Sequence, residues 1–207
     1  KIDNTVVLHN GIDMVRFNTN LYDKNKILKS LNINDNNFII GHIGRFSEVK
    51  NHQFIIRVFR EVKNKIPNAH LILVGTGELE NKIKADVEQF GLMDCVSFLG
   101  NRSDIPELLS VMDVFLFPSH FEGTGIALIE AQAMGLKCVV SEGIPQEAIV
   151  NNNVFTLSLN KPIKEWCECI LEENTNNVDK KNEERLKKYD LNVIIKKLEK
   201  IYSGDAL

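Results

Sequence analysis

Long apolar runs, an excess of either charge and linker-like segments are all missing from this sequence of 207 residues. No uninterrupted apolar stretch approaches the ~20 residues that a membrane-spanning helix needs. Lys+Arg number 25 and Asp+Glu 28, which leaves a formal net charge of -3 and no general attraction to nucleic acid or anionic lipid. Because no repeat or Pro/Gly/Ser-rich stretch divides the chain before its tail, the length fits one large α/β domain.

Cysteine is scarce and does not form a metal-binding pattern. The four cysteines show neither CxxC spacing nor a histidine at zinc-finger distance; they are Cys95, Cys138, Cys167 and Cys169. Cys95 and Cys138 lie beside apolar strand-like runs, so we expect them to be small buried residues. We expect all four to be free thiols in a reducing compartment, which makes the cytoplasm the predicted location.

Short β-rich runs alternate with longer helical runs along most of the chain. The predicted strands cover residues 38–44, 70–75, 95–100, 114–117, 137–141 and 154–157. Helical spacing of apolar residues predicts helices over 52–66, 78–90 and 126–134, and a short helix is expected after Ser103 or Asp104. Short apolar strands separated by such helices predict right-handed crossovers and a parallel sheet covered on both faces. The predicted fold is therefore a doubly wound, Rossmann-like α/β domain, whose ligands bind at the carboxyl ends of the strands.

Four strand-to-helix loops are polar or contain glycine, and the first carries two cations. The loop 44–51 places Arg45 and Lys50 at the carboxyl edge of the sheet, directly before a helix N-terminus. A guanidinium fork, a mobile ammonium group and helix-end amides together suit a diphosphate. Two solvated loop cations are the equally weighted alternative.

The next two loops are less informative. Gly75-Thr76-Gly77 resembles the start of a dinucleotide fingerprint, but Glu80 stands where the third glycine is required. This disfavours a nicotinamide site, and a tight turn into a helix is the simpler interpretation. The loop 100–104 would either line a pocket with polar edges or only cap a helix.

The fourth loop, 118–125, leads into an alanine-rich helix and brings two carboxylates close in sequence. Glu122 lies in the loop and Glu130 in the helix, eight residues later. If the helix begins near Gly125, its rise of ~1.5 Å per residue carries Glu130 about 8 Å along the axis. One carboxylate would then meet the hydroxyls of one sugar and the other those of a second, with glycine amides facing phosphates between them. Glutamates at this spacing also occur by chance in many helices.

Taken together, these motifs resemble the C-terminal domain of retaining glycosyltransferases with the GT-B fold, specifically glycosyltransferase family 4. The resemblance covers nearly the whole chain, through residues 7–13, Gly44-Arg45 with Lys50-Asn51, Val74-Gly75-x-Gly77 and the Glu-x7-Glu motif. It begins where the second half of such an enzyme begins, and the N-terminus lacks both Met and a signal-peptide layout. We therefore expect residues 1–207 to form a single nucleotide-sugar-binding domain, a fragment without its N-terminal acceptor domain.

The resemblance implies a role for each candidate residue. Arg45 and Lys50 would bind the donor's diphosphate and stabilise the charge that builds up on the leaving nucleotide. Glu122 would contact the donor sugar, and Glu130 would hold the ribose hydroxyls. Asn101 and Arg102 would lie near the base. The remaining residues implied in donor binding are Gly44, Gly123, Thr124, Gly125 and Ile126.

The resemblance implies no cofactor and no metal, because no Asp-x-Asp motif is present and the two cations can replace a metal ion. It implies an NDP-sugar donor, with UDP expected, and transfer of a hexose-type sugar to a saccharide or lipid-linked acceptor held by the missing domain. Peripheral membrane association of the intact enzyme is compatible with this role, and the fragment alone is expected to be inactive. No nucleic-acid partner is expected.

Two departures from the family pattern bear on the substrate. Thr124 stands where the family often has an aromatic residue, so the packing of the donor sugar is expected to differ. The usual Gly-rich segment and Pro-Glu pair are replaced by residues 141–147. This variant, with Trp166 downstream, resembles a subgroup that makes capsular polysaccharide or exopolysaccharide.

Two other functions stay open from the sequence. An enzyme of the same fold would epimerise or hydrolyse its sugar nucleotide. A non-catalytic, Rossmann-like binding module would use the polar loops only as helix caps.

The tail, from about residue 174 to 207, is predicted to be a polar connection followed by a C-terminal helix. Apolar residues of that helix follow a helical stripe; they are Leu191, Ile194, Ile195, Leu198, Ile201 and Tyr202. We expect this stripe to pack on the domain. Some apolar surface should stay exposed, because in intact enzymes of this fold the C-terminal helix crosses to the other half.

Overall fold

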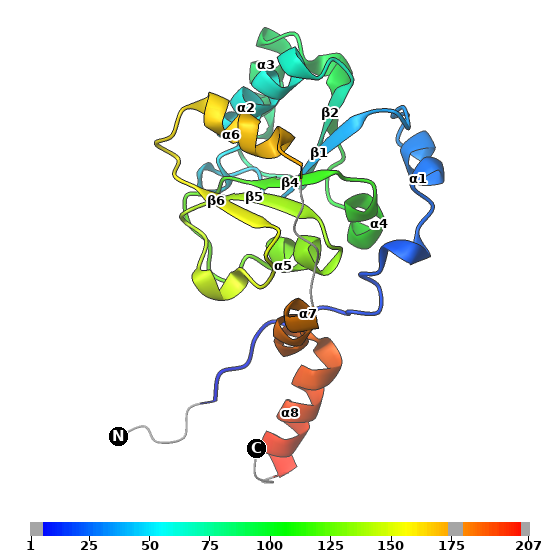
Figure 1. The fold of residues 1–207 in the computed structure, drawn as a ribbon, viewed down its shortest axis with the longest axis vertical. Coiled ribbons are helices and arrows are strands. Elements are labelled where there is room, and N and C mark those ends of the chain that lie inside the picture. Colours follow the sequence, from blue (N-terminus) through cyan, green and yellow to red (C-terminus); the bar gives the residue numbers. More distant parts are fainter. Residues whose placement is uncertain (1–5, 174–179, 204–207) are drawn as a thin grey trace.

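A single parallel β-sheet organises the chain in the computed structural model, which describes residues 6–173 and 180–203 (Figure 1). The six strands lie in the order β3-β2-β1-β4-β5-β6, and every neighbouring pair is parallel. Their bounds are β1 Phe38–Ile43, β2 Ala69–Val74, β3 Val96–Phe98, β4 Val114–Phe117, β5 Lys137–Ser141 and β6 Val154–Leu157. The predicted doubly wound, Rossmann-like fold is confirmed.

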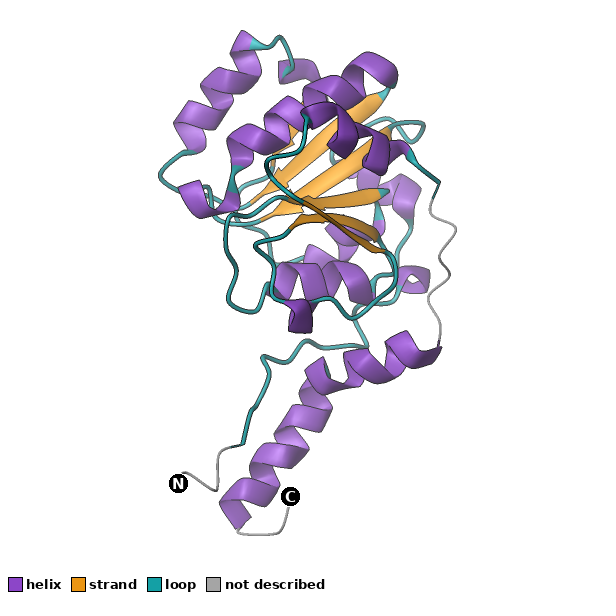
Figure 2. Ribbon diagram, turned by 60° about the vertical axis from the view of Figure 1, so that its left-hand side comes forward, coloured by secondary structure: helices purple, strands orange, loops and turns teal. Residues whose placement is uncertain are grey.

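Helices cover both faces of this sheet (Figures 1 and 2). On one face lie α2 His52–Lys65, α3 Glu80–Gln89 and α6 Ile163–Leu171, and on the other lie α1 Lys24–Ser30, α4 Ile105–Ser110 and α5 Ile126–Ala133. The predicted helices are all present, whereas α1 and α6 were not foreseen. None of the helices within the described residues has the length and apolarity to cross a lipid bilayer.

The strands β1, β2, β4 and β5 each contribute to two apolar cores, because alternate side chains point to opposite faces of the sheet. In β4, Phe115 and Phe117 belong to the core beneath α4 and α5, while Leu116 belongs to the core beneath α2 and α6. In the second core the Trp166 ring of α6 packs edge-on against Phe54 of α2, with ring centroids 5.0 Å apart. The sheet is thus buried on both faces, which leaves the strand ends as the place for polar chemistry.

The C-terminal segment departs from its prediction. Helices α7 Lys180–Leu186 and α8 Leu191–Ser203 follow residues 174–179, which lie outside the described residues. Of the expected α8 stripe only Ile194 is buried, whereas Ile195 is 42% and Tyr202 87% exposed. The prediction that the stripe packs on the domain is therefore wrong, while the expected exposed apolar surface is confirmed.

The reason is the way in which α8 is attached. The leading segment, residues 6–22, meets the start of α8 at Ile12, whose N–H donates to Tyr189 O at 2.8 Å. The Leu191 N–H in turn donates to Ile12 O at 3.0 Å. Beyond this contact α8 points away from the sheet (Figures 1 and 2), so the domain offers its later turns no surface to bury against.

Two glycines allow the β2–α3 loop to lie directly on the β1–α2 loop. A Cβ atom on Gly75 would overlap the carbonyl oxygen of Gly44, and one on Gly77 would overlap that of Phe46. The Phe46 N–H donates to Thr76 O at 3.0 Å, which closes the contact. The Gly-x-Gly sequence thus serves the close approach of two loops, a role that its interpretation as a tight turn into a helix did not include.

The contact predicts that Gly77→Ala is destabilising although Gly77 has no left-handed backbone. The added methyl group has to displace backbone, so we expect the free energy of unfolding to fall by about 1–3 kcal/mol. Urea denaturation measures this. Gly123→Ala is the matched control, because a Cβ there would meet nothing within 4 Å and should change stability by less than about 0.5 kcal/mol. Equal stability of the two variants would contradict the proposed loop contact.

Candidate functional site

A cleft of about 510 Å³ opens at the carboxyl ends of β1, β2 and β3. Three of the four loops singled out in the sequence meet there; among the lining residues are Gly44, Arg45, Thr76, Asn101, Arg102 and Ile105. Parallel strands place their carboxyl ends at one edge of the sheet. This geometry is why loops more than 50 residues apart converge.

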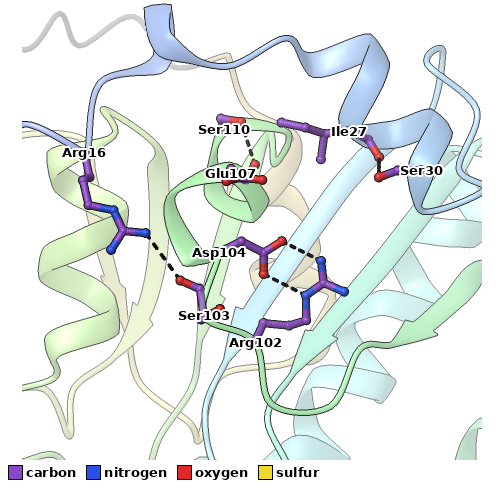
Figure 3. Close-up of polar contacts among 8 residues, drawn as sticks. All are labelled: Arg16, Ile27, Ser30, Arg102, Ser103, Asp104, Glu107 and Ser110. Carbon is purple, nitrogen blue, oxygen red and sulfur yellow. Dashed lines mark hydrogen bonds and ion pairs between the residues drawn. The ribbon is translucent and has the colours of Figure 1, made fainter.

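The two arginines of the cleft are exposed and already paired. Arg45 Nη2 lies 3.1 Å from Glu78 Oε2, with 73% and 54% of the two side chains exposed. Arg102 donates two hydrogen bonds to Asp104, Nε to Oδ1 at 2.8 Å and Nη2 to Oδ2 at 2.5 Å (Figure 3). This pairing lowers the pKa of the Asp104 carboxyl. Asp104 precedes α4 as expected, but its side chain binds Arg102 and makes no hydrogen bond that caps the helix.

Lys50 and Glu122 form a close ion pair beside this cleft. Lys50 Nζ lies 2.5 Å from Glu122 Oε1, and only 20% and 9% of the two side chains are exposed. The Lys50 ammonium also lies 4.9 Å from the centre of the Phe117 ring. Its aliphatic stem runs along Gly44, since a Cβ there would stand 3.2 Å from Lys50 Cδ. The pair therefore joins the β4–α5 loop to the cleft.

Two buried histidines that sequence reasoning missed lie close to Lys50. His42 and His52 are 0% and 1% exposed, their ring centroids are 4.8 Å apart, and Phe46 stacks on His52 at 4.2 Å. Burial lowers the pKa of His52 to about 4 and that of His42 well below its ordinary value, with a further contribution from the Lys50 charge. Both rings are therefore neutral near pH 7. His42 lies in an apolar strand and His52 at the start of a helix. Nothing in the sequence around either histidine distinguishes it from an ordinary core residue.

The β4–α5 loop presents the N-terminus of α5 at the same edge of the sheet. Gly125 precedes the helix in the left-handed conformation, φ +64°, and no side chain caps the first turn. Gly123 has open space around its Cα, and Ile126 is 41% exposed. Uncapped helix amides next to glycine form a favourable environment for an anion.

Glu130 occupies the second turn of α5 and is half-buried. Burial raises the pKa of its carboxyl to about 7, and the positive charge of Arg16 opposes part of this rise. No ion pair among the described residues includes Glu130. Arg16, which sequence reasoning missed, comes from the leading segment and donates from Nη2 to Ser103 O at 3.4 Å (Figure 3).

The predicted residues are thus gathered in three neighbouring groups. The first group, Gly44, Arg45, Asn101 and Arg102, lines the cleft. The second is the Lys50–Glu122 ion pair beside the cleft. The third is Glu130, whose pKa is raised by burial and lowered in part by the charge of Arg16, the residue that donates to Ser103 O. Their roles toward a ligand stay predictions. Within residues 6–173 and 180–203, no group of three or more His, Cys, Asp or Glu residues is placed to hold a metal ion.

Comparison with known proteins gives a family and a fold. The family described as "Glycosyl transferases group 1" matches residues 23–191. A relative named EpsF from Bacillus subtilis (strain 168) is 38% identical over 165 residues, 79% of this chain and 43% of the relative. The UDP-Gal:alpha-D-GlcNAc-diphosphoundecaprenol alpha-1,3-galactosyltransferase of Escherichia coli is 33% identical over 159 residues, 74% of this chain and 41% of the relative. The chain therefore spans about two fifths of the length of these relatives.

Among solved structures, HepE of Anabaena in complex with UDP-glucose superposes with a TM-score of 0.81. The two chains are 23% identical, and the match covers 96% of this chain and 57% of the other. At this identity the likeness shows a shared fold.

The raised pKa of Glu130 predicts how stability depends on pH. Because the folded state holds this proton more tightly than the unfolded state, Glu130 favours folding below pH 4.5 and loses that contribution as pH rises to about 7. Glu130→Gln should therefore become more stable than the wild type across this interval, by at most roughly 3 kcal/mol. Urea denaturation between pH 4 and 8 measures the difference, and Glu88→Gln on the exposed face of α3 controls for the loss of one charge. A difference that does not change with pH would contradict the assignment.

Proposed function

The chain belongs to the group 1 family of glycosyl transferases, and from this premise we propose that it is the nucleotide-sugar-binding half of a retaining family 4 enzyme. The observation that carries this proposal is the Lys50–Glu122 pair, a cation and a carboxylate 2.5 Å apart beside the cleft that holds Arg45. A nucleoside diphosphate sugar has both kinds of group that such a site would bind, because it carries anionic phosphates next to sugar hydroxyls.

Each part of the donor has a candidate partner at the strand ends. Arg45, Lys50 and the uncapped N-terminus of α5 would bind the diphosphate through charge and amide hydrogen bonds. Glu122 would accept hydrogen bonds from the donor sugar, and Glu130 from the ribose. The third loop, at Asn101, would lie near the base.

The same placement suits the chemistry of sugar transfer. When the bond between the sugar and the terminal phosphate breaks, negative charge grows on the leaving diphosphate. Positioned cations that face this growing charge stabilise the transition state by several kcal/mol. In retaining transfer of this kind the leaving phosphate would also assist the attacking acceptor hydroxyl. Lys50 and Arg45 would therefore supply the positive charge that a metal ion supplies in other phosphate sites.

The names of similar proteins support UDP as the nucleotide, and we propose polysaccharide synthesis as the role. The Anabaena structure holds UDP-glucose, and the E. coli relative is named for a UDP-galactose donor and a diphosphoundecaprenol-linked acceptor. We propose a UDP-hexose donor and a saccharide or lipid-linked acceptor that binds outside this chain, in the N-terminal domain of the intact enzyme. The four free thiols, three of them buried, agree with the proposed cytoplasmic location.

Calorimetry with UDP tests the binding site. Each charge-assisted contact to a phosphate contributes about 1.5–3 kcal/mol, so Arg45→Ala and Lys50→Ala should each weaken UDP binding by roughly 10- to 100-fold. Arg57→Ala is the matched control, because this exposed arginine of α2 packs over Phe54 on the α2/α6 side of the sheet. Absence of UDP binding by the wild type would refute the proposal. Unchanged affinity in both site variants would favour a module whose polar loops only cap helices.

A further inference from the structure

Lys50 and Glu122, which are proposed to bind different parts of the donor, bind each other. Building on the proposed function, we propose that Glu122 is a specificity-determining residue that selects sugar-bearing nucleotides over the free nucleoside diphosphate. It does so because sugar hydroxyls offset the loss of its ion pair with Lys50, and a free diphosphate does not.

The Lys50–Glu122 pair is the least exposed ion pair among the described residues. Its side chains are 20% and 9% exposed, compared with 73% and 54% for Arg45 and Glu78 in the neighbouring loops. Exposed pairs separate easily because water solvates both partners. A pair that is mostly buried behaves differently, since removing one partner leaves the other charge desolvated and alone.

Lys50 is the cation that the structure pairs with the Glu122 carboxylate. Lys50 Nζ makes the one side-chain hydrogen bond that the structure gives for the Glu122 carboxylate within residues 6–173 and 180–203. The Glu122 N–H is engaged separately, because it donates to Gly143 O at 3.2 Å and holds the residue in place. His42 and His52 are buried and neutral near pH 7, so they bring no compensating charge.

A diphosphate that takes Lys50 therefore changes the surroundings of Glu122. The carboxylate loses its cation and faces additional negative charge at the same moment. A nucleotide-sugar offers hydroxyl donors to the carboxylate in compensation, whereas a free nucleoside diphosphate offers none. The free diphosphate also carries one more ionisable oxygen on its terminal phosphate, which increases the repulsion.

The same contact bears on product release. Transfer of the sugar removes the hydroxyls that satisfy Glu122 and leaves the fully charged terminal phosphate beside it. Glu122 then favours the return of Lys50, which weakens the hold on the diphosphate. One carboxylate would thus select the substrate and help to expel the product.

Titration of wild type and Glu122→Gln with two kinds of probe tests this inference. The probes are UDP and the tightest-binding of UDP-glucose, UDP-galactose and UDP-N-acetylglucosamine. The neutral amide removes the repulsion but is a poorer partner for sugar hydroxyls than a carboxylate. We expect Glu122→Gln to bind UDP at least fivefold more tightly and the UDP-sugar at least fivefold more weakly than the wild type, so that the selectivity between the two changes by more than 20-fold.

Glu78→Gln is the matched control. It breaks an exposed ion pair of a neighbouring loop and should change both dissociation constants by the same factor. A change of both constants in the same direction in Glu122→Gln would overturn the inference while leaving the proposed function intact. A wild type that binds neither UDP nor any UDP-sugar would overturn both.

Thermal melting establishes whether Glu122→Gln is folded. If it is not, Glu122→Asp decides in the same titrations, because it keeps the charge but retracts it from Lys50 by one methylene group. The weakened pair should lower the selectivity for the UDP-sugar over UDP. An unchanged selectivity would overturn the inference.

Discussion

The close contact of the β1–α2 loop with the loops on both sides of it is the constraint on which the site depends. On one side, Gly75 and Gly77 let the β2–α3 loop lie against Gly44 and Phe46. On the other, His120 N–H donates to Val49 O at 2.8 Å and ties the β4–α5 loop to it. Because parallel strands have their carboxyl ends at one edge of the sheet, the loops that follow them lie next to one another. Their contact sets the positions of the cations and carboxylates more firmly than each loop sequence alone.

The site is electrostatically unfavourable, and the apolar sheet beneath it offsets this cost. Burial raises the pKa of Glu130 to about 7 and lowers that of His52 to about 4. Each shift means that the charged form is less stable here than in water. Strands buried on both faces, such as β2 with six buried residues, supply the stability that makes such positions tolerable. Groups held in this way are preorganised for a ligand, which is common at functional sites.

The sequence allowed the sheet to be predicted because its strands are continuous apolar runs between glycines and helices, as at Phe38–Ile43 and Ala69–Val74. It also indicated which loops carry polar residues. It did not reveal that Lys50 and Glu122 pair with each other, since residues 72 apart meet only through tertiary packing. Arg16 was missed for the same reason, and α1 because its seven residues bury only Leu28. The sequence of α8 showed helical periodicity, which indicates that one face of the helix is apolar. It does not indicate which surface packs against that face.

Arg45, Arg102 and Lys50 are each paired with a carboxylate, so anion binding by these cations is an exchange of partners. Arg45 and Arg102 pair with Glu78 and Asp104. The first of these pairs is exposed enough for water to take over the released carboxylate, so exchange there costs little and discriminates little. Lys50 and Glu122 form a mostly buried pair, from which water is largely excluded. Discrimination between ligands should therefore concentrate at the least exposed pair, because only there must the ligand itself satisfy both partners.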